Sequence, residues 1–504
     1  MFFVFSTSDS ALPFTGFYQG DAETFFRYAR AILGGQVYDS GIPFHPPGFP
    51  YVLAGVQSLL GAGEATAQVP HLAVKLALAL VSSCSVGLIY LLVRPYLGKT
   101  VALVTSLLCL YHFGLYVIAI APVSEGVFLS LLLASLWVWT RKLSHPLSAW
   151  GSLAGKVQNL PQREAAWGFT LGVMLGLLAL TRAESALLTA SLWGIGLTGW
   201  LLRARTGEAT ARTLTPWILV ALGVALTLAP WTLRNSRSLE ATNQSLGAAM
   251  VEPLPTFVPL TLYGPLNLAL ANHSAAEGTF SRDLMSSQSQ SGTLQLTDPQ
   301  HLSFLLHGDE MAWSYIRANP REWLGLVGTK WRLVLETTKL GWSQWNWPGG
   351  LTGLRRPIDI FVPYSRAASM LQIPLLLLGL ILCLWKPGPE RRWGAIVLLV
   401  SGCTFLVTAL FFGYVRQGVL LTPLWASLLG FGLVSLARAG RRWVKPTSSP
   451  SRRWLQLAAA GILALFLLEA WGATQSRKFE ATGTTLPGRT YLNPDLTIYL
   501  KPLG

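Results

Sequence analysis

The sequence predicts an all-α, polytopic membrane protein, and three observations carry this prediction. First, 51% of the residues are apolar and only 12% are charged, whereas charged residues make up about a quarter of a soluble globular domain. Second, apolar runs of about 20 residues, long enough to cross a bilayer, recur along the chain. Third, the basic residues gather in alternate loops between these runs.

The apolar runs predict about ten transmembrane helices. The cysteines Cys84, Cys109, Cys383 and Cys403 fall inside these runs with no metal-like spacing, so we interpret them as packing residues and predict no metal cluster. In chain order the predicted spans lie near 68–93, 99–120, 122–140, 166–181, 183–202, 213–231, 368–386, 394–412, 414–437 and 454–472.

The net charge of +15 orients the chain rather than binding a polyanion. The positive-inside rule assigns loops rich in Lys and Arg to the cytoplasm. The charge therefore implies no nucleic-acid partner. The basic loops contain Arg94 and Lys99; Arg141, Lys142, Lys156 and Arg163; Arg203, Arg205 and Arg212; Lys386, Arg391 and Arg392; and Arg438, Arg441, Arg442, Lys445, Arg452 and Arg453.

With this orientation, residues 1–504 form a single membrane domain with two outward insertions of functional size, 1–67 and 232–367. A connection as long as 232–367 is usually folded or functional. The tail 473–504 also faces outward. The start Met1–Phe5 is too short to span the membrane, so we expect that the chain begins late and lacks a first helix.

Each insertion is predicted to contain interfacial helices. Residues 24–33 have an amphipathic pattern, and 46–61 is apolar but short and contains three prolines. In the second insertion, Asn319-Pro320 has the features of a helix start and is followed by apolar residues at helical spacing.

The stretch Gly20-Asp21-Ala22-Glu23 places two carboxylates just outside the first predicted span. A carboxylate at this position can deprotonate a hydroxyl or amine, or hold a divalent cation. The alternative is a pair of solvated acids, or an N-cap for the helix that follows. The sequence does not require a cation, so the cofactor stays unknown.

The acids are followed by Gly34-Gly35-Gln36-Val37-Tyr38 and by His45-Pro46-Pro47. This order resembles the first outer loop of the polyprenyl-phosphate-sugar glycosyltransferases of the GT-C fold. These include the protein O-mannosyltransferases and the bacterial aminoarabinose transferases, in glycosyltransferase family 39 and neighbouring families.

The resemblance continues, in order, over most of 17–437. It differs from the family pattern at Ala22, which separates two acids that are adjacent in the family and leaves open which of them is catalytic. The further similar strings are Pro122-Val123-Ser124-Glu125, Leu180-Thr181-Arg182-Ala183-Glu184, Pro230-Trp231-Thr232-Leu233-Arg234-Asn235, Tyr263-Gly264-Pro265-Leu266-Asn267-Leu268, Tyr315-Ile316-Arg317-Ala318-Asn319-Pro320, and Tyr414-Val415-Arg416-Gln417 with Pro423.

The resemblance implies a membrane glycosyltransferase. Such an enzyme moves a hexose or pentose from a polyprenyl-phosphate carrier to a lipid, glycan or protein acceptor, with inversion at the anomeric carbon. The active site faces the outside of a bacterial plasma (inner) membrane. Asp21 is implied as the base that activates the acceptor, with Glu23 as its helper. Metal dependence differs between GT-C branches, so a divalent cation stays open.

The leaving phosphate requires positive charge, and arginine supplies fork-shaped, permanently charged donors. Arg234, at the outer end of a span, is the favoured phosphate ligand, with Arg182 and Arg416 as second choices. The alternative for each is an interfacial arginine that reaches toward lipid head groups. His45, Lys75 and Glu125 complete the predicted substrate-binding set, and Glu184 is expected to pair locally with Arg182.

Two other functional classes compete with this interpretation. A non-enzymatic transporter or flippase of lipid-linked sugars would also need arginines at the outer face, but it would not need a carboxylate poised over the site. A ligase or polymerase that joins whole glycans has a related architecture but usually relies on basic and histidine residues in large outer loops. The effect of substituting Asp21 distinguishes these classes.

Overall fold

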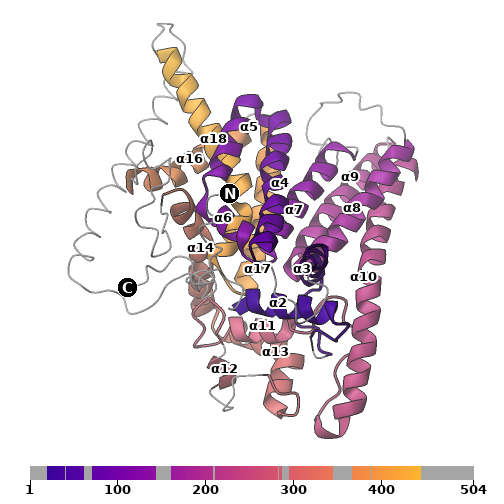
Figure 1. The fold of residues 1–504 in the computed structure, drawn as a ribbon. Coiled ribbons are helices and arrows are strands. Elements are labelled where there is room, and N and C mark those ends of the chain that lie inside the picture. The colour runs from indigo at the N-terminus through magenta and orange to yellow at the C-terminus, as the bar shows by residue number, and fades with distance from the viewer. Residues whose placement is uncertain are drawn as a thin grey trace, which may run out of the picture.

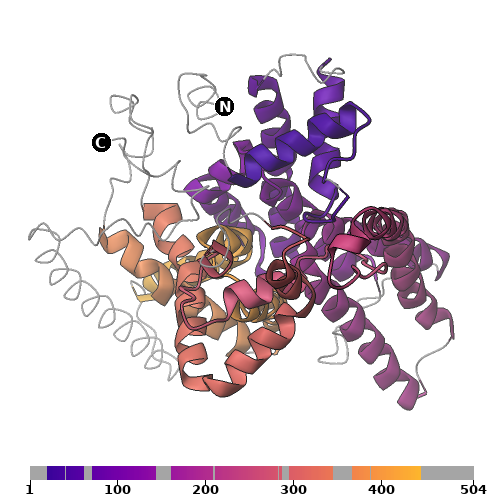
Figure 2. The same ribbon diagram turned by 90° about the horizontal axis from the view of Figure 1, so that it is seen from below.

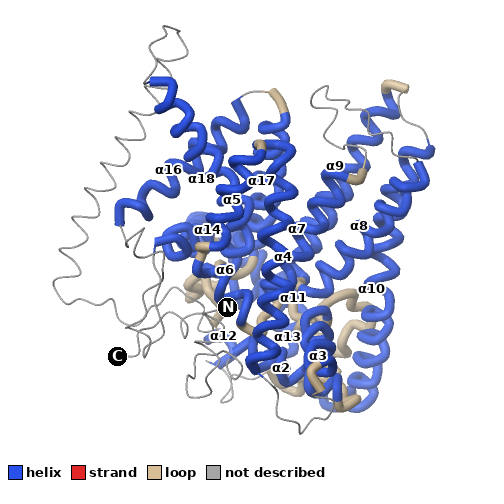
Figure 3. The backbone as a smooth tube through the Cα atoms, turned by 45° about the horizontal axis from the view of Figure 1, so that its top comes forward, coloured by secondary structure: helices blue, strands red, loops and turns tan. Residues whose placement is uncertain are grey.

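The structure is a computed structural model. It describes residues 20–39, 41–61, 71–143, 161–207, 211–281, 283–286, 294–343, 366–385 and 387–443. All regular structure within these ranges is helical, and none of them contains a strand (Figure 3). The all-α prediction is confirmed.

Long apolar helices stand side by side and form the body of the molecule (Figure 1). Among the described residues, six helices are long and apolar enough to cross a membrane. This indicates a multi-pass membrane protein, while the total of about ten spans stays a prediction because 454–472 lies outside the described residues. The six are α4 (His71–Leu97), α8 (Pro161–Thr181), α9 (Ala186–Arg205, preceded by the 3-10 turn η3, Ala183–Ser185), α10 (Ala211–Leu246), α17 (Pro389–Leu410) and α18 (Val415–Trp443).

The predicted span 99–120 is two helices in the structure rather than one. α5 (Lys99–Leu110) ends at Tyr111, and α6 (Phe113–Ile120) begins after His112. The imidazole of His112 is buried, with its Nε2 3.3 Å from the carbonyl oxygen of Thr337. The break between the two helices thus lies at a contact with a distant helix, which apolar periodicity does not reveal. The next run begins as α7 (Glu125–Arg141), and α16 (Arg366–Trp385) is a shorter apolar helix.

Two short helices lie across one end of the bundle, here called the loop end (Figures 1 and 2). They are α2 (Gly20–Leu33) and α3 (Gly48–Leu59), and they pack together through buried Phe25, Phe49 and Leu53. Both helices were predicted, but α2 starts at Gly20 rather than at residue 24. Asp21 therefore lies in its first turn, where the helix dipole favours a negative charge.

The second insertion is also helical at the loop end. It contains η4 (Gly247–Ala249), α11 (Gly264–Ala271), α12 (Asp283–Ser286) and α13 (Pro299–Ala318). α14 (Pro320–Ser343) begins at Pro320, as the sequence predicted, and packs back against α16 and α18. α10 continues past its predicted end at residue 231 as far as Leu246 and supports this insertion from the side.

Candidate functional site

A network of charged side chains joins α2, α7, α18 and the turn before η3. In this network Asp21 Oδ2 accepts a hydrogen bond from Arg416 Nη1 at 2.6 Å. Arg416 Nε lies 3.4 Å from Glu125 Oε1, and the same oxygen also accepts a hydrogen bond from Arg182. The fold therefore brings together four of the residues predicted separately from the sequence: Asp21, Glu125, Arg182 and Arg416.

Arg182 adopts an extended conformation (φ −147°, ψ 113°) between α8 and η3, and this conformation lets its guanidinium reach several partners. Its Nε donates to Glu184 Oε1 at 2.8 Å, as the sequence predicted, and its Nη1 donates to Ser124 Oγ at 3.2 Å. The guanidinium also lies 5.9 Å from the ring centre of Phe128. These contacts fix its position.

Exposure divides the carboxylates of the network into two kinds. The side chain of Glu125 is 1% exposed, whereas those of Asp21 and Glu184 are 30% and 31% exposed. A buried carboxylate needs paired cations to offset its desolvation, and Arg182 and Arg416 provide them. Glu125 therefore holds the two guanidinium groups in place, while Asp21 and Glu184 are the carboxylates that solvent or a ligand can reach.

The carboxyl group of Asp21 is ionised at neutral pH. Burial alone would raise its pKa, but Arg416, His45 and Arg182 lower it below its ordinary value of 3.8. A group that takes a proton must start in its deprotonated form. Asp21 meets this condition.

His45 lies beside Asp21 within a group of aromatic rings. The centre of its ring is 5.1 Å from that of Phe25, 6.0 Å from that of Tyr28 and 4.3 Å from that of Phe44. Burial lowers the pKa of His45 to about 4, because Asp21 opposes this shift only in part and Arg416 and Arg182 add to it. The imidazole is therefore neutral at physiological pH and offers hydrogen bonds rather than charge.

Two glycines allow the close approaches that assemble the network. A Cβ on Gly48, the first residue of α3, would lie 2.8 Å from the carbonyl oxygen of Leu180, two residues before Arg182. A Cβ on Gly413, three residues before Arg416, would collide with the backbone of Lys330 on α14. The first insertion is thus pressed against α8, and the second insertion fixes the start of α18.

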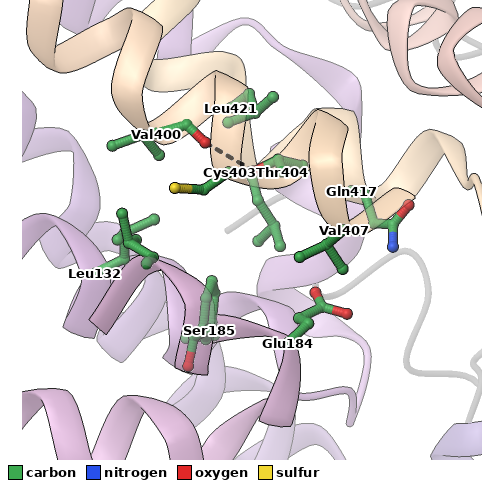
Figure 4. Close-up of a pocket in the computed structure, with 12 residues that line it drawn as sticks. Leu132, Glu184, Ser185, Val400, Cys403, Thr404, Val407, Gln417 and Leu421 are labelled. Atoms are coloured by element: carbon green, nitrogen blue, oxygen red, sulfur yellow. Dashed lines mark hydrogen bonds between the residues drawn. The ribbon is translucent and has the colours of Figure 1, made fainter. Parts of the chain in front are cut away.

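An apolar slot runs from this network into the bundle, between α7, α9, α17 and α18. The space enclosed within it is small, about 40 Å³. Glu184 and Gln417 lie at one end of the slot, and the side chains of Leu132 and Cys403 lie farther in (Figure 4). Because Glu184 is bonded to Arg182, the charged network is at the mouth of the slot.

Two predicted site residues lie outside this network, and the side chain of a third is not described. Arg234 forms an ion pair with Asp39, and Lys75 is fully buried on α4. The side chain of Glu23 lies outside what the structure describes, so its helper role stays a prediction. Sequence reasoning missed Asp39, because an aspartate in a polar turn is ordinary and its partner is 195 positions away in the chain.

The network does not have the form of a metal centre. Within the described ranges, no group of three or more His, Cys, Asp or Glu side chains could hold a metal ion. Asp21 and Glu125 both contact the Arg416 guanidinium, whose positive charge lies where a bridging cation would have to bind. Among the described side chains, the space between Asp21 and Glu125 is thus taken by a guanidinium and not by a cation site.

Residues 44–233 match the family model of dolichyl-phosphate-mannose-protein mannosyltransferases. This match confirms the resemblance found in the motifs. It includes His45, Glu125 and Arg182, and it supports a glycosyltransferase. No curated protein sequence matches the chain.

Solved structures give more distant likenesses. The apo oligosaccharyltransferase of Archaeoglobus fulgidus is 12% identical with a TM-score of 0.42, and the alignment covers 92% of this chain and 54% of that one. ArnT of Cupriavidus metallidurans bound to undecaprenyl phosphate is 13% identical with a TM-score of 0.29, covering 87% and 77%. The chain thus spans about half the length of the archaeal enzyme, and the low TM-scores carry no detail of the site.

Proposed function

We propose that this protein is a membrane glycosyltransferase that moves one sugar from a polyprenyl-phosphate carrier to an acceptor, with inversion at the anomeric carbon. The observation that carries the proposal is the junction of three features: an ionised carboxylate, two guanidinium groups fixed on a buried glutamate, and an apolar slot. A base, a phosphate site and a place for a lipid tail are the parts that this reaction needs.

The apolar slot would receive the first part of the prenyl tail. Its enclosed volume of about 40 Å³ is far below that of sites that enclose a drug-sized ligand, so the helices around the slot would have to move apart for the tail to enter. The rest of the tail would lie in the surrounding lipid. With the tail in the slot, the phosphate lies at the mouth, beside Arg182 and Arg416.

Phosphate binding would displace a carboxylate. The network contains three carboxylates (Asp21, Glu125, Glu184) and two guanidinium groups, so an added anion competes for positive charge. Glu125 is buried and stays, whereas Asp21 is partly exposed and can move. The carrier phosphate would take over the Arg416 donor, and this exchange would release Asp21 toward the acceptor.

Asp21 would then remove the proton from the acceptor hydroxyl or amine as it attacks the anomeric carbon. The bond from that carbon to the acceptor forms while its bond to the phosphate oxygen breaks on the opposite face. Arg182 and Arg416 stabilise the negative charge that develops on the leaving phosphate. The products are the glycosylated acceptor and polyprenyl phosphate, and the proton is on Asp21.

We place this site on the outer (periplasmic) face of a plasma membrane. The support is the distribution of basic residues, because Arg94, Arg203 and the Arg391-Arg392 pair lie at helix ends beside loops that the positive-inside rule assigns to the cytoplasm. The acceptor would be a lipid, glycan or protein that reaches the loop end. A non-enzymatic flippase is less favoured, because the family model that matches describes transferases.

The test is sugar release by the purified protein in lipid bilayers supplied with labelled polyprenyl-phosphate sugars and candidate acceptors. The proposal predicts acceptor-dependent formation of polyprenyl phosphate together with a glycosylated product. A flippase would instead carry the intact donor across the vesicle membrane without cleaving it. Translocation without cleavage, for every donor and acceptor supplied, would contradict the proposal.

A further inference from the structure

Arg234 and Asp39 form a closed ion pair at the edge of the site. Arg234 Nη1 donates to Asp39 Oδ2 at 2.8 Å, and its Nη2 donates to the other carboxylate oxygen. This two-pronged geometry is the strong form of an arginine–carboxylate contact. The side chain of Asp39 is fully buried and that of Arg234 is 27% exposed. Truncating either partner would therefore leave a charge with little access to water.

The Arg234 guanidinium also contacts two aromatic rings and an amide oxygen. Its central carbon lies 4.7 Å from the ring centre of Trp231 and 5.5 Å from that of Tyr38, and these two rings stack at 6.0 Å with an angle of 19°. Nη1 additionally contacts Asn235 Oδ1 at 3.3 Å. Three of its five N–H groups are thus bonded within the protein, so the guanidinium is held in place as a structural group.

The pair belongs to a row of contacts along α10. Ser238, one helical turn after Arg234, donates its hydroxyl to the carbonyl oxygen of Gly41 at 2.9 Å. Gly41 has φ +87°, and a Cβ there would lie 3.2 Å from Thr242 Oγ1, one turn farther along α10. Residues spaced by four lie on one face of a helix. This face of α10 therefore holds the segment from Asp39 to Gly41.

A neighbouring face of α10 holds the second insertion. Trp231 Nε1 donates to the carbonyl oxygen of Leu260 at 2.9 Å, and Asn235 Nδ2 donates to that of Val258 at 2.9 Å. Asn243 exchanges two hydrogen bonds of 2.8 Å with the backbone of Leu254. The extension of α10 thus contacts both insertions and links them.

A chain of aromatic contacts connects the extension of α10 to the helix that carries the proposed base, Asp21. The ring of Tyr38 lies 4.7 Å from that of Tyr28, which in turn lies 6.0 Å from the ring of His45. Tyr28 is on α2, seven residues and about two turns after Asp21. A shift of the segment around Asp39 would therefore move Tyr28 and His45, and with them α2.

We propose that Asp39 and Arg234 form a positioning clamp, which fixes the first insertion on α10 and thereby holds Asp21 in register with Arg416. This inference rests on the proposed transferase function. It gives Asp39 a role that the sequence did not suggest. It also gives Arg234 a role different from that of phosphate ligand, which the sequence favoured.

The experiment compares Asp39→Asn, Arg234→Gln and the double variant with the wild type in lipid bilayers. The clamp predicts that each single change lowers kcat by about 10–100-fold, since a displacement near 1 Å can cost about 100-fold. The KM for the lipid-linked sugar should stay within about twofold. The double variant should be no worse than the single variants, because partners in one interaction are not additive. Arg237→Gln, an exposed arginine on the same helix, serves as the matched control and should behave as the wild type.

A phosphate-ligand role for Arg234 gives a different result and would overturn the clamp. In that case Arg234→Gln raises KM and weakens the binding of polyprenyl phosphate, whereas Asp39→Asn leaves both unchanged. A third readout does not depend on transfer: trypsin cleavage at Arg27 and Arg30 of α2. The clamp predicts faster cleavage in both single variants and not in Arg237→Gln, and equal cleavage in all of them would contradict it.

This third readout separates the two proposals. If the wild type transfers no sugar, the proposed function fails, and the trypsin result still decides whether Asp39 and Arg234 hold the first insertion in place.

Discussion

At the scale of single residues, Asp21 and Arg416 define the proposed chemistry. A carboxylate that is partly buried would ordinarily become a weaker acid, and the guanidinium groups reverse this tendency. The same contact that keeps Asp21 ionised also occupies Arg416, so this guanidinium is already paired in the resting site. Substrate binding and release of the base are therefore linked through one arginine.

The variant Arg416→Gln should shift the acid limb of the pH–rate profile upward. A base acts in its deprotonated form, so activity falls as the pH drops through its pKa. The pKa of Asp21 lies below 3.8 because Arg416, His45 and Arg182 outweigh burial. Without Arg416, burial is opposed by fewer positive charges, and the pKa of Asp21 rises.

The measurement is the pH dependence of kcat/KM, with exposed Arg438→Gln on the same helix as the control. An acid limb that does not move would count against Asp21 as the base.

His45 should contribute no ionisation near neutral pH. Its pKa of about 4 leaves it neutral above about pH 5. His45→Gln keeps hydrogen-bonding capacity, so we expect a lower rate but an unchanged shape of the pH–rate profile between about pH 6 and 8. If the wild type showed a limb near pH 6.5 that this variant lacked, the neutral assignment would be wrong.

At the scale of elements, the site depends on how α3 meets α8. α3 begins at Gly48 against the last turn of α8, and Arg182 follows that turn directly. A side chain at this contact must push the two helices apart. The position of Arg182 and that of His45 are thus set by a contact between backbones.

Gly48→Ala should destabilise the protein by about 1–3 kcal/mol, since overpacking against a backbone atom is not easily relieved. Its Cβ would lie 2.8 Å from the carbonyl oxygen of Leu180. Gly55→Ala is the matched control on the same helix, because a Cβ there meets nothing within 4 Å, and it should be neutral or stabilising by up to about 1 kcal/mol. Thermal unfolding in detergent or lipid measures both. Equal midpoints for the two variants would show that the close approach is not a constraint.

At the scale of the whole molecule, the apolar slot connects the charged network to the membrane-embedded body.

Thr404→Trp should fill the slot from α17. We expect a rise in KM of about tenfold or more for a long-chain lipid carrier, because a loss of about 1.4 kcal/mol of binding free energy corresponds to tenfold. A donor analogue with a very short tail should be affected less. Leu406→Trp, on the lipid-facing side of the same helix (53% exposed), is the control. Equal KM values for the two variants would place the tail elsewhere.

The sequence predicted the parts of this molecule better than their connections. Hydropathy located the long helices, and the motifs nominated Asp21, Glu125, Arg182 and Arg416 one by one. The sequence did not show that these four residues share one network, because an ion pair between residues hundreds of positions apart leaves no local sequence signal. The extension of α10 beyond residue 231 was also missed, since its sequence turns polar there and no longer contributes to hydropathy. Asp39 had no signal at all without its partner Arg234.

The most direct test of the central claim is sugar transfer by Asp21→Asn beside the wild type, with binding of polyprenyl phosphate measured on the same preparations. Asparagine keeps an oxygen that can accept the hydrogen bond from Arg416, but it cannot take up a proton. We predict that kcat falls by about 10²–10⁴-fold, the range expected for loss of a general base, while carrier binding is retained. Transfer at the wild-type rate by Asp21→Asn would contradict the assignment of this residue as the base.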